Sequence, residues 1–155
     1  MKHLTGDLLE MGKNGDFDII VHGCNCLNTM GSGIARQIRE QLPDAWLADQ
    51  ETVKGNKDKL GTYTVGVHGK LIIVNAYTQY AYNVSGFTED QFEYESFQTI
   101  LDKLAVRWGC ARFGFPLIGM GLAGGDKERI MSLLEEFSAK VEAQGGSVTL
   151  VEFGK

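Results

Sequence analysis

The feature that most constrains this chain is the alternation of short apolar runs with longer segments of helical period. A short apolar run bounded by turn residues is typical of a buried strand, whereas apolar residues spaced three and four apart are typical of a helix. Strands that alternate with helices pack as a sheet covered by helices. The sequence therefore predicts an α/β domain with strands at residues 2–5, 17–23, 62–68, 71–76, 112–117 and 147–153.

Two of the expected strands, 62–68 and 71–76, are separated only by Gly69-Lys70. A two-residue connection that contains glycine is a plausible hairpin turn, and the strands of a hairpin run antiparallel. We therefore expect a mixed sheet rather than a purely parallel one.

Three helices follow from the spacing of apolar residues. The first begins at about Gly33 and is broken or kinked at Pro43, and its apolar side carries Ile34, Ile38 and Leu42. The middle helix opens at the capping box Thr88-Glu89-Asp90-Gln91 and buries Phe97, Ile100, Leu101, Leu104 and Trp108. The last helix stops at Gly145-Gly146 and buries Ile130, Leu133, Leu134, Phe137 and Val141.

Length and charge bound the class of protein. With 155 residues, 43% of them hydrophobic, we expect a single domain spanning 1–155, and we expect it to be a monomer. No run approaches the roughly 18 apolar residues of a membrane span, and the first residues lack the apolar stretch of a signal peptide. A cytoplasmic protein without a membrane partner is the expectation. The net charge of −5 argues against non-specific nucleic-acid binding, which needs clustered Lys and Arg.

Cysteine and histidine residues are too few and too scattered to predict disulfides or a metal site. The three cysteines are an odd number, which agrees with a reducing compartment. Cys24-Asn25-Cys26 resembles half of a metal site, but the sequence holds no second close pair of Cys or His residues. We expect no metal ion and no cofactor.

Two glycine-rich turns stand where an expected strand passes into an expected helix. Gly31-Ser32-Gly33 follows the strand 17–23, and Gly119-Met120-Gly121 follows the strand 112–117. Such turns present backbone N–H groups at the positive end of a helix dipole, so they hold an anion without any net positive charge. Two of them at one end of the sheet predict a cleft for a diphosphate. An ordinary tight turn explains each of them equally well when it is taken alone.

Three segments together resemble the signatures of the macrodomain family, in the family's order. They are Gly6-Asp7-Leu8, Asn25 followed by Met30-Gly31-Ser32-Gly33-Ile34-Ala35, and Pro116-Leu117-Ile118-Gly119-Met120-Gly121-Leu122-Ala123-Gly124-Gly125-Asp126. The resemblance spans nearly the whole chain. It implies a three-layer α/β/α sandwich with a mixed central sheet and an ADP-ribose cleft at its crest.

The resemblance also implies a role for each residue of the cleft. Asp7 would accept a hydrogen bond from the adenine amino group beside the backbone of Leu8, and Phe153 would stack on adenine. Asn25 would face the distal ribose. The pyrophosphate would be held from two sides by the loops Gly31, Ser32, Gly33, Ile34 and Ile118, Gly119, Met120, Gly121, Leu122.

Each of these side chains also has a purely structural explanation. Asp7 can cap a turn after Gly6, and Asn25 can bridge backbone groups in its own loop. Phe153 alternates with Val151 in the last expected strand, where a core position is the more common one. His22 lies in a strand that enters the first glycine turn, where a buried structural histidine is the alternative to a base.

Within the macrodomains the chain is most similar to the branch that acts on ADP-ribose 1″-phosphate, through Tyr77-Thr78-Gln79 and the segment that ends at Asp126. Lys127 departs from that branch, which usually has tryptophan there. Hydrolysis of a phosphate monoester without a metal needs a positioned water, donors for the phosphate oxygens and an acid for the leaving oxygen. We expect Asp126 to be the acid or base, with Asn25 and His22 as positioning or proton-transfer partners. A plain helix N-cap is the alternative for Asp126.

Other functions stay open. A non-catalytic reader or sequestering module for ADP-ribose or an NAD-derived signal needs only the cleft. A related branch removes ADP-ribose from protein carboxylates or DNA with a loop lysine, but no lysine occurs between Lys70 and Lys103, which leaves only a substrate-assisted glycohydrolase. A redox enzyme is disfavoured because Gly31-x-Gly33-x-x-Arg36 lacks the last glycine of the dinucleotide-binding fingerprint.

Overall fold

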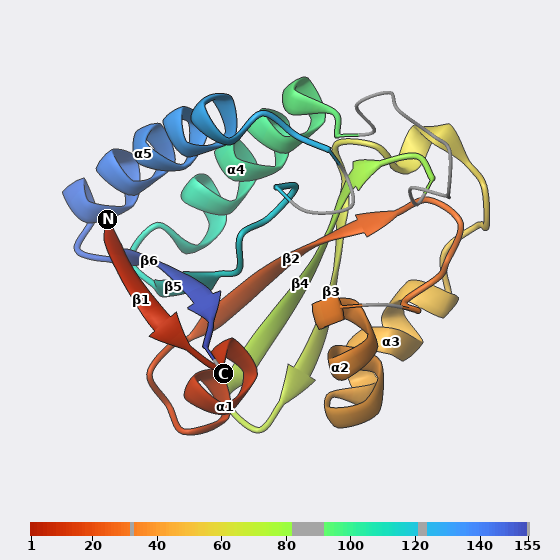
Figure 1. The fold of residues 1–155 in the computed structure, drawn as a ribbon, viewed down its shortest axis with the longest axis horizontal. Coiled ribbons are helices and arrows are strands. Elements are labelled where there is room, and N and C mark those ends of the chain that lie inside the picture. The colour runs from red at the N-terminus through yellow and green to blue at the C-terminus, as the bar shows by residue number, and fades with distance from the viewer. Residues whose placement is uncertain (32, 82–91, 121–123, 155) are drawn as a thin grey trace.

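The computed structural model describes residues 1–31, 33–81, 92–120 and 124–154, which form a six-stranded sheet between two layers of helices (Figure 1). The strand order is β1-β6-β5-β2-β4-β3, in which β3 alone runs antiparallel to its neighbour. The expected α/β class, mixed sheet and six strands are confirmed. The strands are β1 (Lys2–Gly6), β2 (Ile19–Asn25), β3 (Tyr63–His68), β4 (Leu71–Gln79), β5 (Arg112–Phe115) and β6 (Ser147–Phe153).

Strands β3 and β4 form the expected hairpin, in which His68 pairs with Leu71. Gly69 in the turn has a φ of +62°, a left-handed conformation that glycine adopts without steric cost. The hairpin places the only antiparallel pair of the described sheet at one of its edges, and the parallel strands fill the rest.

Helices cover both faces of the sheet (Figure 1). One layer consists of α4 (Tyr94–Trp108) and α5 (Lys127–Ala143), and the other of α1 (Leu8–Lys13), α2 (Gly33–Gln41) and α3 (Pro43–Gln50). Pro43 separates α2 from α3, as expected, because proline lacks the N–H that a continuing helix needs but is well suited to a first turn. Helix α1 was not expected, since six residues are too few to show a helical period.

The start of α4 corrects an expectation. The helix begins at Tyr94, because Phe92 before it pairs with Gln79 as an isolated β-bridge and Glu93 occupies the N-cap position. The capping box at residues 88–91 lies outside the described residues. On the inward face of the helix, Phe97, Ile100, Leu101 and Leu104 are buried as expected, whereas Trp108 in the last turn is only partly buried against the core.

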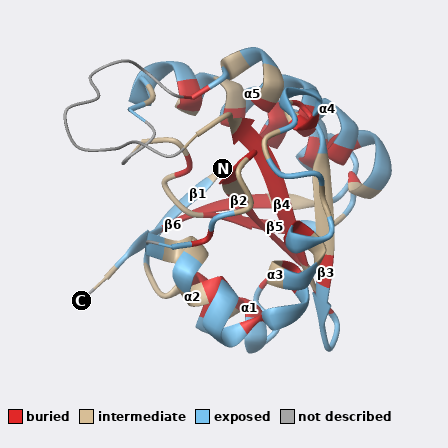
Figure 2. Cartoon of the chain, turned by 90° about the vertical axis from the view of Figure 1, so that its right-hand side faces the viewer, coloured by how far each residue is buried: buried red, intermediate tan, exposed pale blue. Residues whose placement is uncertain are grey.

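The sheet is buried from both sides, which explains why its strands read as nearly continuous apolar runs. In β2 the side chains alternate between the faces: Ile19 and Val21 belong to the core under α4 and α5, and Ile20 to the core under α1 and α2. Figure 2 shows these buried strands between the two helix layers. None of the described helices is long and apolar enough to cross a membrane.

Five parallel strands end at one edge of the sheet. The chain leaves β1 at Asp7, β2 beyond Asn25, β4 beyond Gln79 and β5 at Pro116, all on this edge, and Phe153 closes β6 there. Ligands of open α/β sheets bind outside the carboxyl ends of the strands. A ligand site is therefore expected at this edge.

Candidate functional site

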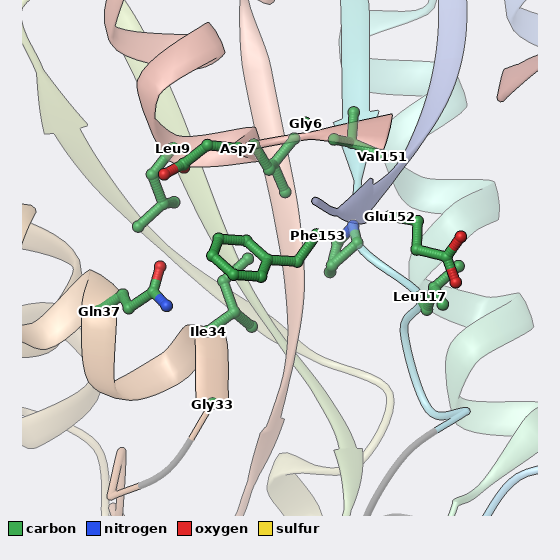
Figure 3. A pocket seen from close by; sticks show the side chains of 12 residues that line it. Gly6, Asp7, Leu9, Gly33, Ile34, Gln37, Leu117, Val151, Glu152 and Phe153 are labelled. Carbon is green, nitrogen blue, oxygen red and sulfur yellow. The ribbon is translucent and has the colours of Figure 1, made fainter. Parts of the chain in front are cut away.

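A pocket of about 340 Å³ opens at the carboxyl ends of β1 and β6, beside the first turn of α2 (Figure 3). Its volume is within the roughly 300–1,000 Å³ of small-molecule sites. It brings together segments that are far apart in the sequence. The lining residues are Gly6, Asp7, Leu8, Leu9, Gly33, Ile34, Gln37, Pro116, Leu117, Val151, Glu152 and Phe153.

Asp7 stands at the junction of β1 and α1, where it has a structural role as well as a place in the pocket. Its side chain accepts a hydrogen bond from the backbone N–H of Glu10 at 3.1 Å and so caps α1. Only Oδ1 takes part in this bond, and Oδ2 has no hydrogen-bond partner among the described residues. The explanation of Asp7 as a cap is therefore correct, and the capping bond leaves its second carboxylate oxygen available to a ligand in the pocket.

Phe153 is 62% exposed at the end of β6 and is not a core residue. Val151, two positions earlier, is buried, so the strand passes from the core into the pocket wall between these two residues. Figure 3 shows the Phe153 ring in the pocket near Ile34 and Gln37 of α2. An exposed ring on a pocket wall is a surface on which a flat heterocycle stacks.

The first glycine turn meets the pocket at the start of α2. Gly33 has a φ of +57°, and nothing lies within 4 Å of the position that a Cβ would take there or at Gly31. Gly33 and Ile34 line the pocket, so the unpaired N–H groups of the first helical turn are close to it. Ser32 lies outside the described residues. This end of α2 is suited to an anion.

Pro116 and Leu117, which precede the second glycine turn, line the same pocket, whereas the predicted site residues Ile118, Gly119 and Met120 are not among its lining residues. A Cβ at Gly119 would lie 2.5 Å from the Phe92 ring, and Gly119 has a φ of +75°, so glycine is required there. The carbonyl of Gly119 accepts a hydrogen bond from Gly125 N–H at 2.7 Å, which closes the loop. Ile118 is buried in the core beneath it, and Gly121 and Leu122 lie outside the described residues.

Asn25 holds the loop that follows β2 through hydrogen bonds, as its structural explanation predicted. Its Nδ2 donates to the hydroxyl and the carbonyl of Thr29 at 2.8 and 3.2 Å, and its Oδ1 accepts from the N–H of Leu27 at 2.9 Å. The side chain is 8% exposed. Both ends of the amide are thus engaged within the loop.

His22 is buried on the face of the sheet that α3 covers. Its Nε2 lies 2.6 Å from Oδ1 of Asn75, whose Nδ2 donates to the carbonyl of Ala45 in α3. Because Asn75 presents an acceptor, Nε2 of His22 carries the proton and donates. Burial lowers the pKa of His22 to about 4, against the raising effect of the Asn75 hydrogen bond, so the ring is neutral at pH 7.

Asp126 is the N-cap of α5, on the other face of the sheet. Its carboxylate accepts hydrogen bonds from the N–H groups of Glu128 and Arg129 at 3.0 and 3.5 Å. Its own N–H donates to the hydroxyl of Tyr94 at 2.8 Å. The side chain is exposed. The structure thus does not bring the side chains of His22 and Asp126 together, and the catalytic role of each stays a prediction.

Seven lining residues were not expected as site residues: Gly6, Leu9, Gln37, Pro116, Leu117, Val151 and Glu152. Gln37 follows Gly33 by one helical turn, so the spacing of α2 was a signal that could have found it. Leu117 belongs to the segment 116–126 that carries the family resemblance, whereas Glu152 has no such signal. They are also shared with a neighbouring cavity of about 180 Å³, which Lys127 lines.

The described residues contain no group of three or more His, Cys, Asp or Glu side chains that could hold a metal ion. The pocket walls contain an exposed ring, two carboxylates, an amide and a helix N-terminus. This combination suits an organic anion with one flat polar heterocycle.

No protein-family model matches the chain. The chain is 32% identical, over 161 residues that cover 92% of each protein, to an uncharacterized 17.5 kDa protein of Enterobacteria phage T4 from the tk-vs intergenic region.

Solved structures share the fold. A protein of Bacteroides thetaiotaomicron is similar with a TM-score of 0.78 at 22% identity, over 98% of this chain and 99% of that one. A macrodomain protein from Streptomyces coelicolor has a TM-score of 0.71 at 23% identity, over 99% of each chain. Thermosipho africanus DarTG in complex with ADP-ribose has a TM-score of 0.68 at 16% identity, over 89% of this chain and 38% of that one. These similarities show a macrodomain fold.

Proposed function

We propose a function for this chain, which belongs to the same family as the phage T4 17.5 kDa protein and has the macrodomain fold: it binds ADP-ribose and hydrolyses ADP-ribose 1″-phosphate. The observation that carries the proposal is the pocket in which Asp7, the start of α2 and Phe153 meet. A nucleoside diphosphate needs a stacking surface, a base-recognition group and an anion site in this order, and the pocket offers all three. The ADP-ribose bound to the similar DarTG structure supports the choice of ligand.

The adenine is proposed to lie on Phe153, with its amino group donating to Oδ2 of Asp7 beside the backbone of Leu8. The pyrophosphate then faces the first N–H groups of α2, in the loop Gly31, Ser32, Gly33 and Ile34, where the helix dipole favours negative charge. The loop of Ile118, Gly119, Met120, Gly121 and Leu122 is proposed to close on it from the other side. Asn25 shapes the distal end by holding its own loop.

The proposed reaction breaks the P–O bond of the 1″-phosphate. Water adds to phosphorus, the ribose oxygen leaves and takes up a proton, and ADP-ribose and inorganic phosphate are released. Asp126 is the proposed proton-transfer group, since it is an exposed carboxylate at the start of a helix directly after the second glycine loop. The neutral, buried His22 and the engaged Asn25 are proposed to keep the loop in place for this step.

A second candidate is a non-catalytic reader or sequestering module for ADP-ribose or a related NAD-derived signal. One observation favours it: Asn25, His22 and Asp126 each make structural hydrogen bonds, and none of the three lines the pocket. A glycohydrolase is a weaker candidate for two reasons. The segment between Lys70 and Lys103 has no lysine, and Ala123 stands directly after the second glycine loop, where the lysine-dependent macrodomain branch has an aspartate.

Titration calorimetry with ADP-ribose, beside a phosphate-release assay with ADP-ribose 1″-phosphate, tests the proposal. We expect binding and metal-independent release, with the rate lowered roughly a hundredfold or more in Asp126→Asn, as is typical for loss of an acid or base. Asparagine caps a helix as well as aspartate does, so the fold is retained. Binding without release would refute the phosphatase and leave the reader, and absence of binding would refute both.

A further inference from the structure

A lysine is buried against the start of the loop between β2 and α2, and it is not among the residues that line the pocket. Lys59 belongs to the 3₁₀ turn Lys57–Lys59 and is 8% exposed. Lysine is seldom buried to this extent unless its ammonium group is paired. No carboxylate of the described residues forms an ion pair with Lys59. Asp49 is close enough for the charge of Lys59 to lower the pKa of Asp49, although burial raises that pKa by more. The position of this charge therefore calls for an explanation.

The ammonium group of Lys59 makes its hydrogen bonds to the loop between β2 and α2 and to one neighbour of that loop. It donates to the carbonyl of Cys26 at 3.0 Å, to Oδ1 of Asn28, and to the hydroxyl of Thr52 at 2.8 Å. It also lies 5.1 Å from the centre of the Tyr77 ring, a cation–π distance. All three donors are thus satisfied by neutral acceptors.

The loop that these bonds hold has a strained residue at its centre. Asn28 has a φ of +57°, the one left-handed conformation outside glycine among the described residues. Its side chain donates to the carbonyl of Thr52 at 3.0 Å, and its carbonyl accepts from Nε2 of Gln50 at 2.9 Å. The strain of a left-handed asparagine persists only where surrounding contacts fix it. Lys59 and Thr52 supply such contacts.

The glycines that follow have no side chain through which neighbouring residues could hold them. Nothing lies near the Cβ positions of Gly31 and Gly33, and both residues are exposed. Ahead of Gly31 the loop is held by the hydrogen bonds of Asn25, Cys26 and Asn28 and by the buried side chain of Met30. A loop of glycines loses much conformational entropy when it closes on an anion, and anchoring one end beforehand reduces that loss.

We propose that Lys59 is a positioning residue, which holds the loop through Cys26 and Asn28 in the conformation that receives the pyrophosphate of the ligand. The inference rests on the proposed function, since it assigns the anion to this loop. The described hydrogen bonds of the Lys59 ammonium group reach no residue of the pocket wall, so we expect it to act through the loop. It should therefore matter for the diphosphate and not for the adenine, whose proposed contacts Asp7 and Phe153 are in other segments.

The test compares two probes on matched variants. Lys59→Met keeps the length and packing of the side chain and removes its donors, while Lys57→Met removes an equal charge from the same turn at an exposed position. We expect Lys59→Met to weaken binding of ADP-ribose at least tenfold and binding of adenosine less than twofold, in titrations monitored by calorimetry and by NMR. Lys57→Met should change neither.

Two further variants separate positioning from general damage. Asn28→Gly suits the left-handed backbone but lacks the acceptor for Lys59, so it should reproduce the selective loss of ADP-ribose affinity even if Lys59→Met fails to fold. Lys59→Arg should restore part of the affinity, because it keeps the charge and several donors.

Three results would overturn the inference. They are wild-type ADP-ribose affinity in Lys59→Met and in Asn28→Gly, an equal loss for adenosine and ADP-ribose, or an equal loss in Lys57→Met. Failure of the proposed function is distinguishable, since the wild-type protein itself would then not bind ADP-ribose, and the inference would fall with it.

Discussion

The Asp7 carboxylate has two roles that one substitution separates. One oxygen caps α1 through the N–H of Glu10 at 3.1 Å, and the other is available to the proposed adenine amino group. Serine caps a helix about as well as aspartate does, but it is shorter and uncharged. Asp7→Ser therefore keeps the cap of α1 and removes the proposed contact with the ligand.

The size of the effect follows from the charge on the acceptor. A hydrogen bond to a charged group contributes about 1.5–3 kcal/mol, and 1.4 kcal/mol corresponds to a tenfold change in affinity. We expect Asp7→Ser to lower the affinity for ADP-ribose about 10- to 150-fold, with a change in Tm below about 2 °C. Asp7→Ala loses the cap as well, about 1 kcal/mol, so its Tm should fall by roughly 2–4 °C.

The assay is calorimetric titration with ADP-ribose on the wild type and both variants, with thermal unfolding measured on the same samples. The two variants should agree in affinity and differ in Tm. Wild-type affinity in Asp7→Ser, together with a lowered Tm in Asp7→Ala, would show that Asp7 is a helix cap and nothing more, and the placement of adenine would be wrong.

Two other predictions concern stability. Thr78 is fully buried, and its hydroxyl has no hydrogen-bond partner among the residues that the structure describes, so Thr78→Val should raise the free energy of unfolding by about 1 kcal/mol and the Tm by roughly 2–4 °C; a lower Tm would contradict this account. His22 binds its proton less readily when folded, with a pKa of about 4 against 6.5, so the unfolded chain takes up more protons between these values. The contribution of His22 to the free energy of unfolding is therefore fully present above pH 6.5 and is lost, by about 3 kcal/mol, as the pH falls to 4. Urea unfolding of His22→Gln at several pH values should lack this part of the pH dependence.

The strands were predictable because their signal is local. Each is an apolar run that the sheet buries from both sides, and the Gly69 turn marks the hairpin. The exposure of Phe153 was not predictable from alternation with Val151, because it depends on where the core beneath β6 ends. The alternation of side chains along a strand does not indicate how far the elements packed against that strand extend.

The wall of the pocket was predictable in part. Asp7, Leu8, Gly33, Ile34 and Phe153 were expected from motif resemblance, and all of them line it. The positions of Asn25, His22 and Asp126 relative to one another were not predictable, because they depend on which face of the sheet each side chain takes. The burial of Lys59 was not predictable from the sequence, because a lysine in a turn rich in charged residues is normally exposed to solvent. Only the fold brings the loop of Asn28 against it.

An acidic chain that holds a diphosphate must separate its carboxylates from the phosphates. The described pocket wall contains Asp7 and Glu152 and no lysine or arginine, so side-chain charge there is of the wrong sign for an anion. The favourable groups are backbone N–H groups at the start of α2, whose effect depends on direction and short distance rather than on net charge. Affinity for the anionic part of the ligand therefore depends on how accurately the loop before α2 is placed. If the chain binds ADP-ribose as proposed, we therefore expect the contacts of Lys59 and Asn28 to matter more for the pyrophosphate than any cation of the described pocket wall.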